Sequence, residues 1–176
     1  MRGIEQEAAR VIQAQCGDRA ALEQVLRHVQ PPLHRYIVRL VGRTAADDVL
    51  QDALIAIARK LSWLENPVLF RAWAYRIASR AAFAHLRKER RHAREETGED
   101  VLEALVAPAA RPSDEGLRAL LDSAALSPAS RAVLILHFQE DMPLAEVAAV
   151  LEIPVGTVKS RLAYGLTALR RHFADK

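Results

Sequence analysis

Apolar residues recur at the spacing of an α-helix along most of this 176-residue chain. A clear run stands in residues 44–62, at Val49, Leu50, Ala53, Leu54, Ile57 and Leu61. An α-helix of 3.6 residues per turn gathers such positions on one face, whereas a half-buried strand would alternate apolar and polar residues. We find no convincing alternation of that kind. The sequence therefore predicts an all-α fold.

Capping residues and prolines divide the pattern into separate helices. Asp18 suits an N-cap, because its carboxylate can accept from free backbone N–H groups. The helix after it, over residues 19–30, is expected to break or kink at the Pro31-Pro32 pair. The other elements expected before residue 93 are a helix within 2–15, a helix from a Thr44 cap to about Ser62, a loop over 62–68 and a long helix over 69–91.

The composition changes after Arg91. Residues 93–126 hold eight acidic residues against three arginines, and the piece LVAPAARPSDEG has the proline, alanine and glycine content of a linker. A second helical part starts at Ser127-Pro128, a cap followed by proline at the first helical position. We therefore predict two small helical domains, 1–92 and 116–176, joined by a flexible acidic linker over 93–115.

Residues 144–162 have the pattern of two helices that cross at a tight turn. Apolar side chains recur there at Val147, Leu151, Ile153, Val158 and Leu162. Ile153-Pro154 stops the first helix, and proline suits the start of the next. We interpret the pattern as a helix-turn-helix, whose second helix enters the DNA major groove. The alternative is a plain helical hairpin with a solvated basic face.

The second helix of this pair separates three kinds of side chain. Its expected buried stripe holds Val155, Val158, Leu162, Leu166, Leu169 and Phe173. The opposite side is expected to expose the small residues Gly156, Ser160, Ala163 and Thr167. Small outward residues let the helix approach base edges, while cations beside them meet phosphates. The cations in position to do so are Lys159, Arg161, Arg170 and Arg171.

The long helix over 69–91 and the residues after it carry a cationic stripe. Within about 80° around the helix axis lie Arg76, Arg80, Phe83, Arg87, Arg90 and Arg94. Such a stripe suits a nucleic-acid backbone with a base stacked nearby. A merely solvated face is the alternative, but acidic residues do not alternate with these cations. On the other side of the helix, Phe70, Trp73 and Ile77 are expected in the core.

The preceding helix has a small acidic face, made of Asp48, Gln51 and Asp52, outside its apolar stripe. Like charges one turn apart are slightly destabilising, which indicates a basic partner surface. Asp47 and Asp48 could instead favour the positive N-terminus of the helix, but Asp52 lies too far along the helix for that.

Three stretches, in this order, resemble conserved parts of the extracytoplasmic-function group of sigma-70 family factors: DDVLQDALIAIARKL, FRAWAYRIASRAAFAHLRKERR and LSPASRAVLILHFQEDMPLAEVAAVLEIPVGTVKSRL. The resemblance covers both expected domains. It implies that the chain binds bacterial core RNA polymerase and promoter DNA and directs transcription initiation. It also implies an anti-sigma protein as a partner.

The resemblance further implies roles for individual residues. Core polymerase would bind to Asp48, Gln51 and Asp52. The −10 element would be recognised by the loop over 62–68 and the basic helix, through Asn66, Arg76, Arg80 and Arg87. The −35 element would be read by the helix beginning at Pro154, through Val155, Gly156, Thr157, Lys159, Ser160, Arg161 and Arg171.

Four positions depart from the family pattern. The family commonly has Asn at the position of Arg80 and Asp at that of Ala84, which indicates an unusual −10 sequence. Tyr164 and Leu166 stand where many members carry a more basic run, which indicates weaker contacts with −35 phosphates.

The sequence offers little for catalysis. We find no phosphate-binding glycine loop, no nucleophile motif and no metal-ligand spacing among the histidines, so we expect no enzyme activity, metal or cofactor. The single cysteine, Cys16, excludes an internal disulfide and is expected to be buried or inert. No apolar run approaches the roughly 20 residues that span a bilayer. We expect a cytoplasmic protein with no membrane partner.

Two other functions stay open at this point. A sigma mimic that captures an anti-sigma protein would account for Arg80 and Ala84, but not for the preserved PVGTVKSR motif. A stand-alone helix-turn-helix regulator would leave the whole first domain unexplained.

Overall fold

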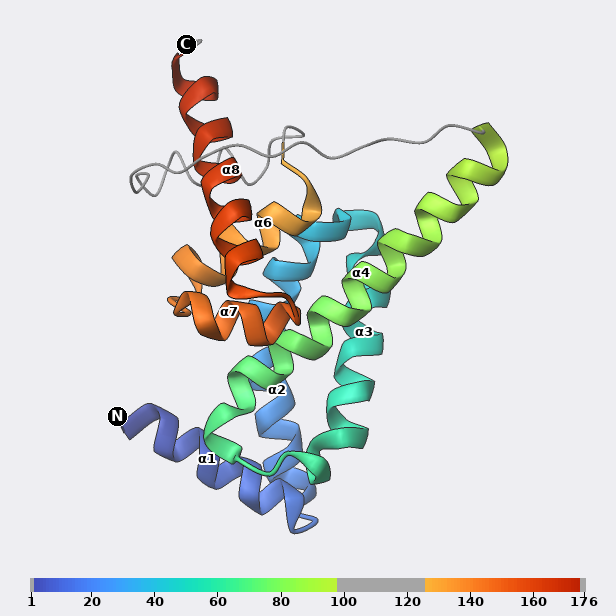
Figure 1. Ribbon diagram of the computed structural model, residues 1–176. Coiled ribbons are helices and arrows are strands. Elements are labelled where there is room, and N and C mark those ends of the chain that lie inside the picture. Colours follow the sequence, from blue (N-terminus) through green and yellow to red (C-terminus); the bar gives the residue numbers. More distant parts are fainter. Residues whose placement is uncertain (1, 98–125, 175–176) are drawn as a thin grey trace. The chain divides into compact units, whose positions relative to one another are not determined.

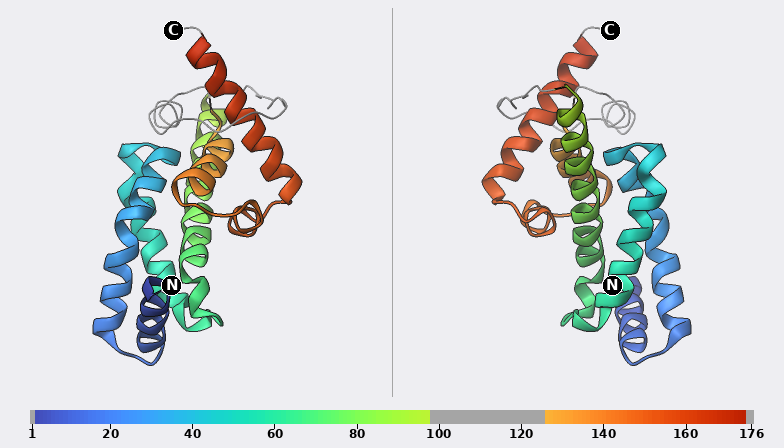
Figure 2. Two further views of the ribbon diagram at one scale, coloured as in Figure 1. Left: turned by 90° about the vertical axis from the view of Figure 1, so that its left-hand side faces the viewer. Right: turned by 90° about the vertical axis from the view of Figure 1, so that its right-hand side faces the viewer.

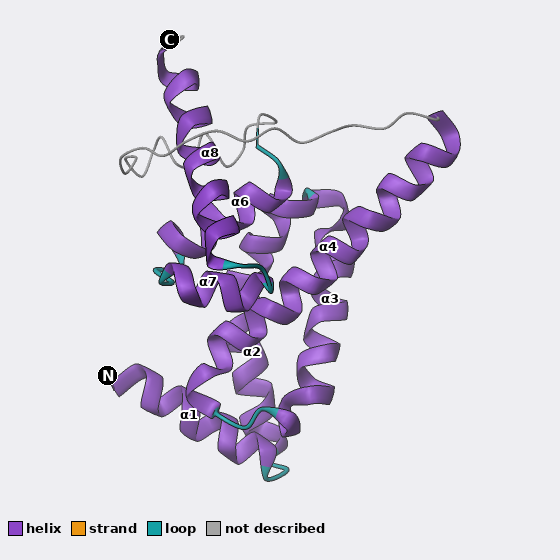
Figure 3. Cartoon of the chain, in the orientation of Figure 1, coloured by secondary structure: helices purple, strands orange, loops and turns teal. Residues whose placement is uncertain are grey.

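The structure is a computed structural model that describes residues 2–97 and 126–174 of the chain. These residues are mostly helical and include no strand, which confirms the all-α prediction (Figure 3). The chain forms two compact units, Met1–Leu86 and Arg87–Lys176. Most of the linker expected over 93–115 lies outside the described residues, and the predicted domain boundaries stay a prediction.

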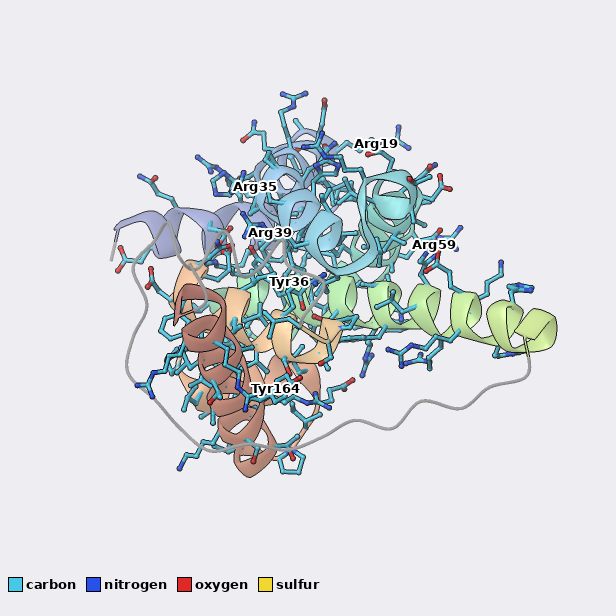
Figure 4. The ribbon with its side chains drawn as sticks, turned by 90° about the horizontal axis from the view of Figure 1, so that it is seen from above. Arg19, Arg35, Tyr36, Arg39, Arg59 and Tyr164 are labelled. Carbon is cyan, nitrogen blue, oxygen red and sulfur yellow. The ribbon has the colours of Figure 1, made fainter. Side chains whose placement is uncertain are left out.

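The first unit is built from α1 (Arg2–Gln15), α2 (Arg19–Val41), α3 (Arg43–Lys60) and most of α4 (Phe70–Thr97). Helix α2 packs against both α1 and α3 (Figures 1 and 2). Tyr36 reaches from α2 toward α4, where its ring meets Tyr75 edge to face with a centroid distance of 5.4 Å (Figure 4). This contact joins α4 to the core that the other three helices share.

Of the break or kink expected at Pro31-Pro32, the break does not occur, because α2 continues through both prolines. The prolines remove the backbone donors that would bond to the carbonyl oxygens of Arg27 and His28. Both of those residues are exposed, so water can satisfy their oxygens. Buried side chains on either side of the prolines, Val29 and Leu33, hold the two halves of the helix against one core.

The helix starts are capped in two different ways. The Asp18 carboxylate accepts from two backbone N–H groups at 2.8 and 3.1 Å, which confirms it as the cap of α2. The Thr44 cap was wrong, because α3 begins at Arg43 with Gly42 as its N-cap and no side-chain cap. Gly42 also ends α2, donating its N–H to Val38 O at 2.9 Å. Its φ of +81° lies in the region that glycine adopts without strain.

The loop expected over 62–68 contains parts of two short 3₁₀ turns, η1 (Leu61–Trp63) and η2 (Pro67–Leu69). Helix α4 follows at Phe70 and runs to Thr97, beyond its expected end near residue 91. The first unit therefore presents a short, ordered loop between α3 and α4.

The second unit contains α6 (Pro128–Leu134), the π-helical turn η3 (Ile135–Gln139), α7 (Leu144–Leu151) and α8 (Val155–Ala174). The predicted cap is confirmed, because Ser127 Oγ accepts from the N–H of Ser130 at 3.2 Å. Helix α8 packs against α6 and α7. A Cβ at Gly165 would lie 2.6 Å from Leu134 Cδ1, so glycine permits the close approach of α8 to α6.

Candidate nucleic-acid interfaces and acidic face

Helices α7 and α8 form the predicted helix-turn-helix (Figure 1). Val147 and Ala148 of α7 are buried, as is Val158 of α8. At the turn, Glu152 adopts a φ of +56° and donates its N–H to the carbonyl of Ala148. This left-handed residue ends α7 and redirects the chain, so that α8 begins at Val155.

The first two turns of α8 carry most of the residues predicted for the −35 element. Of the full set, Gly156, Lys159 and Arg171 are exposed, and Thr157, Ser160 and Arg161 are half-buried. No neighbouring atom lies within 4 Å of a Cβ built at Gly156, so the helix backbone there is open to a close approach. This surface combines an accessible backbone with cationic side chains, as a groove-binding helix requires.

The buried face of α8 differs from the predicted stripe. Val155 was expected to be buried but is 40% exposed, and Ala163 was expected to be exposed but is only 5% exposed. Leu166 is buried, as the stripe predicted, so its interpretation as a replaced phosphate contact was wrong. Ala163 is buried because α6 and α7 both cover α8, which widens its buried face beyond one stripe. Val155 is the first residue of α8. The side chains of Leu169 and Phe173 lie outside the described residues.

Two hydroxyl groups on α8 are bonded within the helix. Ser160 Oγ donates to Gly156 O at 3.1 Å, and Thr167 Oγ1 donates to Ala163 O at 3.0 Å. A hydroxyl has one proton to give, so Ser160 keeps only acceptor capacity for a ligand. Tyr164 is half-buried on the same helix (Figure 4).

The cationic stripe of α4 lies at the surface. Arg80 and Arg87 are exposed, whereas Arg76 and Phe83 are half-buried. Arg90 is exposed too, and the side chain of Arg94 lies outside the described residues. On the other side of α4, Phe70 and Ile77 are buried as predicted and Trp73 is half-buried.

The loop before α4 presents one large aromatic side chain. Trp63 is 74% exposed, while its neighbours Leu61 and Leu64 are buried. Asn66 is exposed, and its Oδ1 caps η2 by accepting from the N–H of Val68 at 3.1 Å. Sequence reasoning selected this loop and Asn66 but did not single out Trp63, although a tryptophan inside the selected loop was a signal for it.

The predicted acidic face on α3 is exposed at Asp48, Gln51 and Asp52. Ile55, 42% exposed, stands one turn from Gln51 and adds an apolar side chain that sequence reasoning missed. It was detectable as an apolar residue outside the buried stripe. Asp47 lies apart from this face, because its carboxylate is 3.1 Å from Nε2 of His34 on α2.

The structure also bears on the expectations for the cysteine, for metal binding and for membrane spans. Cys16 was expected to be buried or inert; it is exposed, which excludes burial, and its inertness stays a prediction. Across the described parts of the chain, no three His, Cys, Asp or Glu side chains are grouped so that they could hold a metal ion. In the same ranges, every helix is too short or too polar to cross a membrane.

Two family models match the chain. Residues 25–92 match Sigma-70 region 2, and residues 124–171 match Sigma-70, region 4. Among curated relatives, the ECF RNA polymerase sigma factor SigL of Mycobacterium tuberculosis is 31% identical over 176 residues, covering 92% of this chain and 94% of its own. SigW of Bacillus subtilis, another ECF RNA polymerase sigma factor, is 26% identical over 179 residues, covering 94% of this chain and 96% of its own.

Solved structures share the fold. CnrH, in complex with the cytosolic domain of CnrY, matches with a TM-score of 0.68 and 25% identity, over 97% of this chain and 98% of its own. The sigma factor RpoE of Bartonella quintana, in complex with the anti-sigma factor NepR, matches with a TM-score of 0.66 and 24% identity, over 86% and 96%.

Proposed function

The chain belongs to the extracytoplasmic-function sigma factors of RNA polymerase, and we propose which of its surfaces meet the polymerase and the promoter. As a sigma factor, it directs promoter-specific initiation by binding core RNA polymerase together with the −10 and −35 elements. The observation that carries our assignment is the division of exposed charge, which is acidic on the face of α3 that holds Asp48, Gln51 and Asp52, and basic on α4 and α8.

We assign −35 recognition to the start of α8. The accessible backbone at Gly156 lets the helix enter the major groove, and the exposed Val155 side chain can contact a thymine methyl group. Thr157 and Ser160 lie within the same turns, and Ser160 would accept a hydrogen bond from an exocyclic amino group. Lys159, Arg161 and Arg171 would contact phosphates.

We assign −10 recognition to the loop over 62–68 and to α4. A melted base needs a surface on which it can stack, and the exposed Trp63 and Asn66 offer an aromatic face and an amide. Arg76, Arg80 and Arg87 would hold the backbone of the displaced strand. Arg80 and Ala84 lie on α4 where the family commonly has Asn and Asp, so we expect a −10 sequence that differs from those of typical relatives.

Core polymerase would bind to Asp48, Gln51 and Asp52, with Ile55 as an apolar contact beside them. Exposed charges at the rim of an interface mainly affect the rate of association, whereas an apolar side chain in its centre slows dissociation. Polymerase binding would bring the two DNA-binding domains to one promoter, so each can bind weakly alone. The proposed domains are 1–92 and 116–176, with a flexible linker over 93–115.

We propose a protein partner that covers these surfaces when the factor is inactive. CnrH, which resembles this chain over almost its whole length, is bound to the cytosolic domain of CnrY. An anti-sigma protein bound to this chain would compete with core polymerase for the acidic face. We place the chain in the cytoplasm, where its polymerase and promoters are, and expect it to act by binding alone.

The test is run-off transcription with bacterial core polymerase, with and without this chain, on a pool of genomic promoters. We expect defined new start sites preceded by shared −10 and −35 sequences. A folded chain that does not bind core polymerase would overturn the proposal and favour a sigma mimic. Core binding without any promoter preference would contradict the −10 and −35 assignments but not the assignment of the polymerase-binding face.

A further inference from the structure

Gln15, at the end of α1, forms two hydrogen bonds to a segment more than forty residues away in sequence. Its Nε2 donates to the carbonyl oxygens of Leu61 and Leu64, both at 2.8 Å. A primary amide has two N–H donors, and both are used here. The side chain therefore holds two backbone oxygens at fixed positions relative to α1.

These two oxygens lie on either side of Trp63. Leu64 N also donates to Leu61 O at 3.1 Å, which closes the η1 turn. Leu61 and Leu64 are buried, so Trp63 projects outward from between two anchored residues. Gln15 thus contacts the backbone at the two ends of the segment that presents Trp63.

The loop has attachments other than Gln15. Helix α1 packs against both η1 and η2, and the buried side chains of Leu61 and Leu64 remain whatever residue stands at position 15. Loss of the two hydrogen bonds should leave the loop attached to the domain but free to change the direction of Trp63. The direction of Trp63 therefore depends on Gln15 more than the folding of the domain does.

We propose that Gln15 is a positioning residue for −10 recognition, because it fixes the backbone that presents Trp63 and Asn66 to the melted strand. The inference rests on the proposed function of the loop over 62–68. Gln15 touches no DNA in this mechanism. It determines how sharply the loop distinguishes one base from another.

The test uses full-length chain with core polymerase and a promoter library randomised separately at the −10 and −35 elements. Gln15→Glu keeps the side-chain shape but replaces the donors with a carboxylate that repels both carbonyls, and Gln15→Ala removes the amide. The matched control is Gln13→Glu, the same change at an exposed position on the same helix. We expect a roughly two- to tenfold loss of −10 base preference in both Gln15 variants, in line with the loss of one or two hydrogen bonds. The −35 preference and core affinity should match those of the control.

A second measurement needs no polymerase. The chain has two tryptophans, so an amide NMR spectrum shows two indole signals, which Trp63→Phe assigns. In Gln15→Ala the Trp63 signal should shift or broaden, while that of Trp73 should not.

The outcomes separate the two proposals. A wild-type −10 preference that persists in both Gln15 variants would overturn the positioning role and leave the proposed function intact. A uniform loss of −10 preference, −35 preference and core affinity would show a general folding defect and overturn it too. A wild-type chain with no −10 preference would overturn the assigned loop function and this inference together, even if the Trp63 signal moved.

Discussion

Tyr36 and Ser79 join α2 to α4 through a buried hydrogen bond of 2.8 Å between their hydroxyl oxygens. Ser79 Oγ gives its own proton to Tyr75 O at 2.7 Å. The tyrosine hydroxyl must therefore be the donor in the bond between the two side chains. Tyr36 thus donates to Ser79, and Ser79 donates to the backbone of α4.

This order predicts unequal effects of two small substitutions. Ser79→Ala leaves the Tyr36 hydroxyl buried without its acceptor and should lower the free energy of unfolding by about 1–3 kcal/mol. Tyr36→Phe leaves Ser79 bonded to the Tyr75 carbonyl and should lower it by about 1 kcal/mol or less. Urea unfolding followed by circular dichroism measures both. Equal losses would contradict the assigned donor order.

Stability should also fall at high pH. Burial raises the pKa of Tyr36 above its ordinary value of 10.0, because it disfavours the charged phenolate. Above pH 10 the unfolded chain gives up this proton while the folded chain keeps it, so alkaline pH favours unfolding. We expect Tyr36 to contribute a loss of about 1.4 kcal/mol per pH unit above that point. The contribution is the difference in slope between wild type and Tyr36→Phe, and equal slopes would refute it.

Gly165 and Gly156, both on α8, should respond in opposite directions to alanine. At Gly165 the new methyl group would press on the buried Leu134, at a cost of about 1–3 kcal/mol that exceeds the gain of about 1 kcal/mol in helix propensity. At Gly156 the methyl group meets no atom within 4 Å, so Gly156→Ala should stabilise the helix by up to about 1 kcal/mol. Thermal unfolding of the two variants tests the pair. A stabilised Gly165→Ala would show that α6 and α8 are not tightly packed.

Arg87 and Lys88 are adjacent exposed cations, but only Arg87 lies in the cationic stripe of α4. Arg87→Ala should weaken promoter binding by the polymerase complex and reduce the slope of log K against log salt by about 1, as expected for one lost phosphate contact. Lys88→Ala, the matched control, should change the slope much less. Binding measured across a salt series distinguishes the variants, and identical slopes would remove the stripe from the DNA interface.

Asp52 should contribute to polymerase affinity without stabilising the fold. Like-charge repulsion from Asp48 ends when Asp52 becomes Arg, so folding stability should not fall. Affinity for core polymerase should drop roughly tenfold. Glu5→Arg, the same charge reversal at an exposed position of α1, is the control. Unchanged core affinity in Asp52→Arg would exclude the acidic face from the interface.

The sequence predicted features that depend on neighbouring residues and failed where distant ones decide. Asp18 and Ser127 cap their helices because a cap needs only the next two or three backbone N–H groups. The break at Pro31-Pro32 was a sound local expectation, but packing of the flanking side chains overrides it. The Thr44 cap is an exception, a local prediction that failed because Gly42, two residues earlier, already joins the two helices.

The candidate sites show the same division. Exposure of Asp48, Asp52 and Arg87 followed from helical spacing alone. Ala163 was misplaced because periodicity cannot reveal that two other helices cover α8. Gln15 could not be found in this way, since its acceptors are 46 and 49 residues along the chain.

The two prolines inside α2 have a consequence for the order in which the chain folds. Helix growth normally adds one backbone bond per residue, and this growth is interrupted where two donors in succession are missing. The segment from Asp18 has its own cap and can nucleate by itself. The segment after Pro32 gains its stability from Tyr36 and Ile37, which are buried in the core that includes α4. During synthesis, therefore, the second half of α2 should reach its full stability only after the ribosome has released α4, which supplies the contact of Tyr75 with Tyr36.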